Sequence, residues 1–161
     1  FNDDLKLKHP SFIKQCLEKA SGKPLFLFLY FSKIHTVTVS DVLKKYEWND
    51  KKFYEKKDEN LKRYDNTFIE VGKYMKTFLD TLKELQIYDN SIIIFFSDHG
   101  TGIGERFSER NYGSFTYEET IRTFHLFISK DIKKGRISEK LRDTIDIFPT
   151  ILDLEIGRAH V

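Results

Sequence analysis

An aspartate and a histidine, Asp98 and His99, stand one serine beyond an apolar run that ends at Phe96. In open α/β sheets, ligands bind outside the carboxyl ends of the strands, where loops leave the buried sheet and present polar groups. Aspartate supplies an anionic oxygen and histidine a neutral imidazole nitrogen, a mixed set that suits zinc or manganese better than an all-oxygen calcium site. The sequence therefore predicts a divalent-metal site at Asp98 and His99.

Three glycines follow in the segment Gly100–Gly104, GTGIG, and let the backbone turn sharply beside a ligand. Two other interpretations stay open. SDHG is an ordinary turn in which His99 is hydrogen-bonded to the backbone, or GTGIG is a phosphate-binding loop with Glu118 or Glu119 as the ribose acid. The phosphate-binding loop is the weaker interpretation, because its third glycine comes one position early and no clean helix pattern follows.

The apolar pattern predicts the elements that position this site. Apolar residues recur at steps of three and four over 66–86, which is typical of an amphipathic helix. Short bounded apolar runs are typical of strands buried on both faces, and they are Leu25–Phe31, Ser91–Phe96 and Thr123–Ser129. Further helices are expected at Ser11–Ala20 and in DTIDIFPTILDL, with Pro149 in or near the first turn. Strands that alternate with helices predict an α/β fold with a mostly parallel sheet.

The charge of the chain gives no support for a nucleic-acid or membrane partner. Its 27 basic and 25 acidic residues leave a formal charge of +2, too small to attract polyanions by composition. Between Lys44 and Arg63, basic residues mix with aromatic ones as in single-strand-binding surfaces, but acidic residues run through the same stretch. We expect a solvated connecting segment there. No apolar run reaches the roughly 20 residues that span a bilayer.

The remaining cysteine and histidines are expected to be structural. The single cysteine, Cys16, excludes an internal disulfide and occupies an apolar position of the first expected helix. His9, directly before Pro10, is expected at a helix start. His125, within TFHLF, is expected in the core with its hydrogen bonds satisfied.

Three motifs in order resemble the carboxyl-terminal half of the sulfatase family, within the alkaline phosphatase superfamily. LKELQIYDNSIIIFFSDHGTGIGE is similar to the family's helix, aspartate-asparagine turn, apolar strand and Ser-Asp-His-Gly, with Gly-Glu shortly after. SFTYEETIRTFHLFI resembles its Tyr-Glu-Glu segment, arginine and apolar strand, and TIDIFPTILDL resembles its Asp-Ile-x-Pro-Thr helix. The resemblance covers most of Leu25–Leu154 and implies a three-layer α/β/α, alkaline phosphatase-like fold.

The resemblance implies metal-dependent hydrolysis of sulfate esters, with a small-molecule or carbohydrate sulfate or phosphate ester as the substrate. Asp98 and His99 would be ligands of a divalent metal ion, namely calcium, manganese or zinc. His35 stands where the family has a histidine that contacts the ester, and an imidazolium there would neutralise its charge or protonate the departing oxygen. The usual Pro-Tyr after that histidine is replaced by TVTV, so a surface or structural role for His35 is the alternative.

Two parts of the family pattern have no counterpart in this chain. The aspartate pair after the first strand is missing, and so is the nucleophile, because Cys16 lacks the proline and arginine of the Cys-x-Pro-x-Arg signature. We expect residues 1–155 to be part of one catalytic domain, inactive by itself, and residues 156–161, IGRAHV, to be a sequencing-adapter artefact. The alternatives are a phosphodiesterase, phosphomonoesterase or phosphoryl or phosphoethanolamine transferase of the same superfamily, and a non-catalytic nucleotide-binding α/β module.

Overall fold

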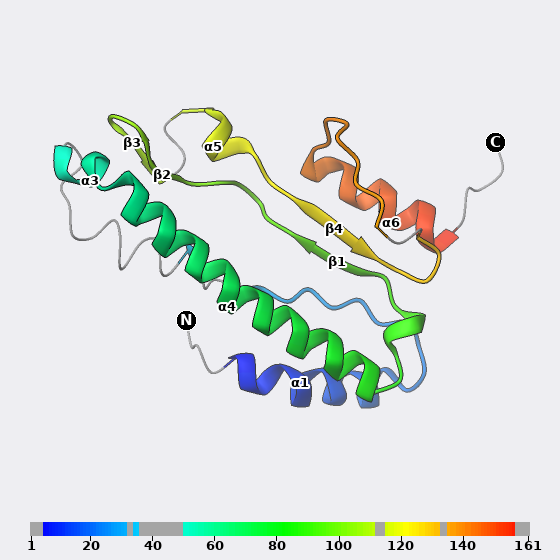
Figure 1. Ribbon diagram of the computed structural model, residues 1–161. Helices are drawn as coiled ribbons and strands as arrows, with labels where there is room; N and C mark the ends of the chain where they lie inside the picture. Colours follow the sequence, from blue (N-terminus) through cyan, green and yellow to red (C-terminus); the bar gives the residue numbers. More distant parts are fainter. Residues whose placement is uncertain (1–4, 32–33, 36–49, 112–114, 133–134, 157–161) are drawn as a thin grey trace.

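Helix α4, Lys57–Glu84, is the longest element of the structure (Figure 1). Its apolar stripe places Leu82 in the hydrophobic core, with Phe78 packed against it. The helix stops because Gln86 takes a φ of 58°, and the Ile87 N–H donates back to the Leu82 carbonyl over 3.0 Å. The helix predicted over 66–86 is therefore confirmed, although it begins earlier, at Lys57.

The computed structural model describes residues 5–31, 34–35, 50–111, 115–132 and 135–156. The other elements are α1 Leu5–Ala20, α3 Lys51–Glu55, the 3₁₀ turn η2 Tyr88–Asn90, β1 Ile93–Phe96, β2 Gly102–Arg106, β3 Glu109–Asn111, α5 Glu118–Ile121, β4 His125–Ile128, the 3₁₀ turn η3 Thr144–Asp146 and α6 Ile147–Ile156. Within these residues, no helix is both long enough and apolar enough to cross a bilayer.

The connecting segment predicted over Lys44–Arg63 is helical from residue 51 onward, so that prediction is wrong for its second half. The Asp50 side chain caps α3 by accepting a hydrogen bond of 2.9 Å from the Lys52 N–H. Phe53 then anchors the segment, because its side chain is completely buried. The pattern of charges did not distinguish a helix from a loop here, because lysine and glutamate are good helix formers as well as typical loop residues. Residues 36–49 lie outside the described part.

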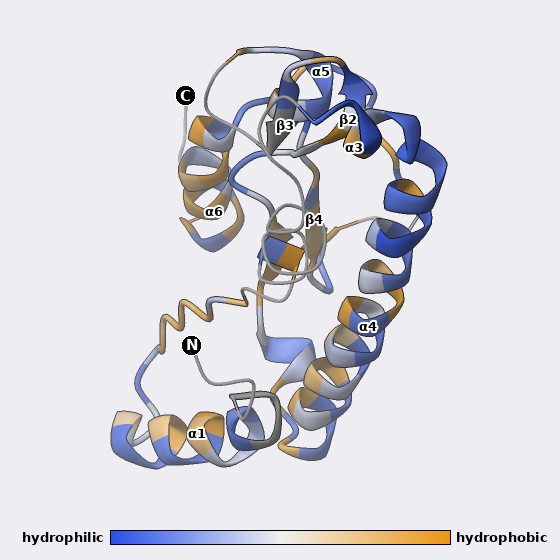
Figure 2. Cartoon of the chain, turned by 90° about the vertical axis from the view of Figure 1, so that its left-hand side faces the viewer, coloured by the Kyte–Doolittle hydropathy of each residue, from blue (hydrophilic) through white to orange (hydrophobic). Residues whose placement is uncertain are grey.

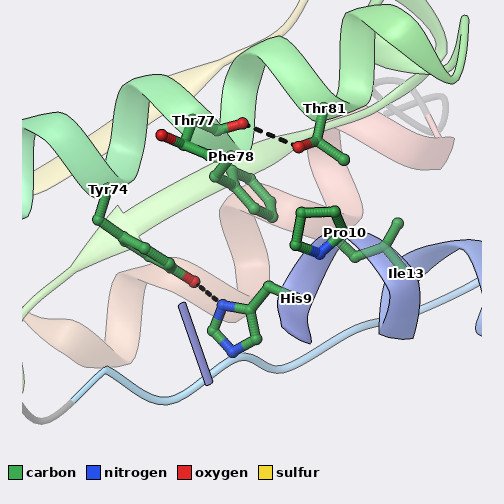
Figure 3. Close-up of a pocket in the computed structure, with 7 residues that line it drawn as sticks. All are labelled: His9, Pro10, Ile13, Tyr74, Thr77, Phe78 and Thr81. Atoms are coloured by element: carbon green, nitrogen blue, oxygen red, sulfur yellow. Dashed lines mark hydrogen bonds between the residues drawn. The ribbon is translucent and has the colours of Figure 1, made fainter. Parts of the chain in front are cut away.

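Helix α1 packs against the carboxyl-terminal half of α4, and a shallow pocket lies between them (Figure 3). His9 lies inside α1 and is buried, with its ring nitrogen Nδ1 hydrogen-bonded to the Tyr74 hydroxyl. Ile13, one turn further along α1, joins the core cluster with Leu82 and Ile93. The prediction that His9 starts a helix is wrong: α1 begins at Leu5 and carries Pro10 inside its early turns.

Strands β1 and β4 form a two-stranded antiparallel sheet, with Ile93 opposite Ile128 and Phe96 opposite His125. The other described sheet, β2 with β3, is antiparallel as well. The prediction of a mostly parallel sheet is therefore wrong for the described strands. Parallel neighbours need a long crossover, usually a helix, whereas β1 reaches β4 through a hairpin and the one-turn helix α5.

Residues 25–31 are extended but belong to neither described sheet. Their side chains alternate: Leu27 and Leu29 pack against the core cluster, whereas Phe26 is 78% and Phe28 66% exposed. The prediction of a strand buried on both faces is therefore wrong for this segment, because only one of its faces is covered. The Phe28 ring still lies 6.3 Å from the ring of Phe96, which places this segment near the end of β1.

The layers around the sheet agree with an α/β fold. Helices α4 and α6 stand on opposite sides of β4 (Figure 2), and β1 and β4 run side by side between them (Figure 1). Helix α6 follows a capping box, in which the Asp143 side chain accepts from the Thr144 N–H and Asp146 accepts from the Asp143 N–H. Pro149 falls in the first turn of α6, as predicted.

Candidate metal centre

The two predicted metal ligands follow β1 and lie side by side. The Asp98 side chain is 78% exposed and the His99 side chain 35%, and 3.8 Å separates Asp98 Oδ2 from His99 Nε2. Metal bonds to carboxylate oxygen and imidazole nitrogen are about 2.0–2.2 Å long. One cation therefore fits against both atoms with little movement of either side chain.

The His99 imidazole is oriented by its other nitrogen. Nδ1 lies 2.6 Å from the Gly100 carbonyl oxygen. A carbonyl only accepts hydrogen bonds, so Nδ1 carries the proton and the lone pair of the neutral ring lies on Nε2. This is the arrangement found in metal-binding histidines, where a backbone carbonyl commonly fixes the tautomer. The hydrogen bond from His99 to the backbone, which the alternative interpretation of SDHG expects, is present at this ring nitrogen.

Helix α5 holds the loop that carries both residues. The Gly100 N–H donates to the Thr120 carbonyl over 2.9 Å. A Cβ on Gly100 would lie 2.4 Å from the carbonyl oxygen of Glu119 and 2.9 Å from that of Arg122. Contacts under 3.0 Å with backbone atoms leave no room for a side chain, so glycine is required here for close approach.

Further hydrogen bonds stabilise both sides of this contact. The Ser97 hydroxyl donates to the His99 carbonyl over 2.6 Å, and the Ser97 N–H donates to the Phe124 carbonyl over 3.4 Å. On α5, the buried Thr120 hydroxyl lies 2.9 Å from the Phe115 carbonyl and 2.8 Å from the Tyr117 carbonyl. The serine of SDHG and the threonine of YEET therefore keep the loop and α5 in register.

The β2–β3 hairpin lies beside α5 and is joined to it by an ion pair. Arg106 Nε donates to Glu119 Oε1 over 2.7 Å, and the guanidinium lies 4.4 Å from the centre of the Tyr117 ring. The alternative interpretation of GTGIG as a phosphate-binding loop is wrong, because the segment leads into strand β2 instead of a helix whose N-terminus would hold a pyrophosphate.

The hairpin is tied in turn to the start of α4. Asn60 is buried, and its Nδ2 donates to the carbonyls of Phe53 over 3.0 Å and Ile103 over 3.2 Å. Gly104 has a φ of 114°, a backbone conformation that residues with a side chain rarely adopt. Burial, together with the nearby Glu105 and Asp65 carboxylates, raises the pKa of the Tyr64 phenol.

Asp98 and His99 are two candidate ligands that the described residues bring together. No group of three or more His, Cys, Asp and Glu side chains within the described ranges is arranged to hold a metal ion. His35 is exposed and adjoins residues outside the described part, so its role stays a prediction. His125 lies opposite Phe96, and its Nε2 is buried with no hydrogen-bond partner, so the prediction of a satisfied core histidine is wrong.

Two residues that shape the site were missed from the sequence, Arg106 and Glu119. They lie thirteen positions apart, a separation that follows no helix or strand period. Glu119 belongs to the Tyr-Glu-Glu segment, and this motif is the signal that could have pointed to it. The sequence did not show that its partner would be the arginine at the end of β2.

The profile of the Sulfatase family matches residues 9–156, nearly the whole chain. The chain belongs to the sulfatase family. It is 31% identical over 117 residues to lipoteichoic acid synthase 1 of Bacillus subtilis, which covers 63% of this chain and 18% of that protein. It is 32% identical over 96 residues to an N-acetylglucosamine-6-O-sulfatase of Bacteroides thetaiotaomicron, which covers 58% of this chain and 16% of that protein.

A third relative carries the name of a further activity, that of a sulfotransferase. The low-salt glycan biosynthesis sulfotransferase Agl7 of Haloferax volcanii is 29% identical over 122 residues, which covers 71% of this chain and 28% of that protein. The chain thus spans less than a third of each of these relatives. No solved structure matches it. Membership in the family confirms the resemblance carried by SDHG, Tyr-Glu-Glu and the Asp-Ile-x-Pro-Thr helix.

Proposed function

We propose that the protein containing this chain hydrolyses sulfate esters and that Asp98 and His99 bind the divalent metal ion of that reaction. The observation that carries this proposal is the orientation of His99. Its Nδ1 donates to the Gly100 carbonyl over 2.6 Å, so its lone pair is on Nε2, 3.8 Å from Asp98 Oδ2. A carboxylate and an imidazole held in this way suit zinc or manganese.

Each residue of this site would have a separate role in the reaction. The Asp98 carboxylate supplies negative charge, and the backbone of α5 holds Gly100 so that His99 keeps its tautomer. When bound, the cation would act as a Lewis acid on the ester. His35, as an imidazolium, would neutralise charge on the ester or give a proton to the departing oxygen. The nucleophile is assigned to a part of the protein outside these 161 residues, since no residue here matches the family's signature.

Replacement of Asp98 by asparagine tests the metal site directly. Asp98→Asn keeps the shape of the side chain but removes its charge, so we expect Mn²⁺ affinity of the chain to fall at least tenfold and sulfatase activity of the whole protein to disappear. Asp153→Asn is the matched control, because Asp153 is an exposed aspartate on α6. Equal Mn²⁺ binding by the two variants, measured by electron paramagnetic resonance, would refute the assignment of Asp98.

A second candidate function is phosphoryl transfer or phosphoester hydrolysis on the same site. The similarity to a lipoteichoic acid synthase favours it. Sulfate and phosphate esters present similar tetrahedral oxyanions, so Asp98 and His99 suit either one. Turnover by the whole protein of an aryl sulfate, compared with a phosphate monoester and a phosphate diester of the same phenol, separates the two functions.

A further inference from the structure

The ion pair of Arg106 and Glu119 differs from the other ion pairs of the described residues. Its N–O distance is 2.7 Å, and the Glu119 side chain is only 13% exposed. The described Lys and Arg pairs apart from this one join residues three or four positions apart, within one helix or between a helix and its cap residue, and their carboxylates are 41% exposed or more. Arg106 and Glu119 instead join two separate elements, β2 and α5. The Arg106 side chain is 52% exposed, so the shielding of this pair lies on the Glu119 side, and the contact restrains both elements.

The aromatic ring of Tyr117 completes the contact. The Arg106 guanidinium lies 4.4 Å from the ring centre, in the geometry of a cation–π interaction. Tyr117 is the N-cap residue of α5, and its carbonyl accepts from the Thr120 N–H over 2.9 Å. The Arg106 side chain of β2 therefore contacts the start of α5 at two residues, Glu119 and Tyr117.

Helix α5 in turn contacts the loop that carries Asp98 and His99. The Thr120 carbonyl accepts a hydrogen bond from the Gly100 N–H. The Glu119 carbonyl oxygen lies 2.4 Å from the position that a Cβ on Gly100 would take. The Gly100 carbonyl then accepts a hydrogen bond from the Nδ1–H of His99 over 2.6 Å. A continuous series of contacts thus runs from Arg106 through Glu119 and Gly100 to the His99 ring.

We propose that Arg106 is a positioning residue for the metal site. Its bond to Glu119 and its stacking on Tyr117 hold α5 in place, α5 orients the Gly100 carbonyl, and that carbonyl fixes the tautomer of His99. This inference rests on the proposed function only for the identity of the ligand at Nε2. The link from Arg106 to the His99 ring stands on the contacts alone.

Arginine is required at this position for its shape as well as its charge. Its planar guanidinium bonds Glu119 through Nε while its face covers the Tyr117 ring, and an ammonium group reproduces only the charge. Arg106→Lys is therefore expected to restore part of the function that Arg106→Gln loses. A residue that only adds surface charge would be fully replaced by lysine.

The test combines Mn²⁺ affinity with the ¹⁵N resonances of the His99 ring, which report which ring nitrogen carries the proton. In Arg106→Gln we expect an affinity about tenfold lower and a mixture of His99 tautomers instead of the Nδ1–H form alone. Arg106→Lys should fall between this variant and the parent. Arg122→Gln is the matched control: it breaks the Arg122–Glu118 pair of the same helix, which is 3.8 Å long and 78% and 69% exposed, and should change neither readout.

Each outcome decides the inference. It is overturned if Arg106→Gln keeps both the parent affinity and the single tautomer, or if Arg122→Gln loses as much. Should Arg106→Gln unfold the chain, Glu119→Ala carries the test with the same two readouts and the same expected losses, because it removes the carboxylate that accepts from Arg106 Nε. If the parent chain binds no Mn²⁺, the proposed metal site fails, while the tautomer measurement still decides whether Arg106 acts on His99.

Discussion

Helix α1 and the carboxyl-terminal half of α4 meet through apolar side chains, whereas backbone and polar contacts assemble the segment around the candidate metal loop. In the first region, Ile13, Leu82 and Ile93 are buried together from three different elements. In the second, α5 and β2 are held by the Gly100–Thr120 hydrogen bond and the Arg106–Glu119 ion pair. The molecule thus has an apolar region and a polar region joined by α4.

The difference teaches which property each region controls. Apolar burial is non-directional and proportional to area, so the apolar region stabilises the fold but does not orient a side chain finely. Hydrogen bonds and close backbone contacts depend on distance and angle. The polar region therefore fixes the His99 ring and contributes less to the free energy of unfolding. Substitutions in the two regions should separate stability from cation binding.

Truncation in the apolar region should give the largest loss of stability. Leu82→Ala removes a core side chain that is 5% exposed, and the cavity should lower the free energy of unfolding by about 2–5 kcal/mol. Cation binding by the molecules that stay folded should not change. Urea denaturation measures the loss, with Leu61→Ala as the control on the same helix, since Leu61 is 42% exposed. Similar losses in the two variants would contradict the core position of Leu82.

A methyl group at Gly100 should disturb the polar region most. Gly100→Ala places a Cβ 2.4 Å and 2.9 Å from two backbone carbonyls of the α5 segment, and the forced shift should cost about 1–3 kcal/mol. It should also remove most Mn²⁺ affinity, because the carbonyl that orients His99 moves.

Gly72 provides the matched control for this substitution. It lies within α4, and a Cβ there would meet nothing within 4 Å. Gly72→Ala should therefore raise stability by about 0.5–1 kcal/mol, through the better helix propensity of alanine, and leave Mn²⁺ affinity alone. A parent-like Mn²⁺ affinity in Gly100→Ala would break the proposed link between α5 and the metal loop.

Loss of the buried amide that joins the hairpin to α4 should have an intermediate effect. Asn60→Ala leaves the carbonyls of Phe53 and Ile103 without their Nδ2 donor, which should cost about 1–3 kcal/mol. Asn66→Ala changes an exposed asparagine of the same helix and should cost far less. Thermal unfolding of both variants measures the difference, and equal midpoints would show that the Asn60 contacts add nothing.

The sequence predicted the apolar region better than the polar one. The period of Phe68 to Leu85 and the run before Ser97 identified α4 and β1, because burial leaves a repeating pattern in the residues. The contacts of Arg106, Glu119 and Asn60 left no such pattern, since each depends on where two distant segments meet. The antiparallel pairing of β1 with β4 was missed for the same reason.

The candidate metal pair could be selected from the sequence because its two residues are adjacent and closely follow a strand. Motif position was enough to select Asp98 and His99. The reason for the glycine of SDHG was not visible: it serves a close approach to α5 more than a turn beside a ligand. His9 was also misplaced, because a histidine before proline suggested a helix start and the partner Tyr74 lies 65 positions away.

The pairing of His9 with Tyr74 predicts the smallest of these effects, a pH dependence confined to the apolar region. Burial lowers the pKa of His9 below its ordinary value of 6.5 and raises the pKa of Tyr74 to about 12. Tyr74 on α4 is the titratable group facing His9, with Phe31 stacked on its ring at 4.5 Å and the threonines Thr77 and Thr81 along the pocket. The phenol therefore stays protonated throughout the range in which His9 titrates.

The sign of the effect follows from where each state binds protons. Below pH 6.5 the unfolded chain binds a proton at His9 before the folded chain does, so the free energy of unfolding falls as the pH drops from 6.5 toward the lowered folded pKa. Above 6.5 this contribution is constant. His9→Gln should flatten this part of the stability profile measured by urea denaturation, while His99 keeps its tautomer. An unchanged slope in His9→Gln would mean that protonation of another group weakens the contact between α1 and α4.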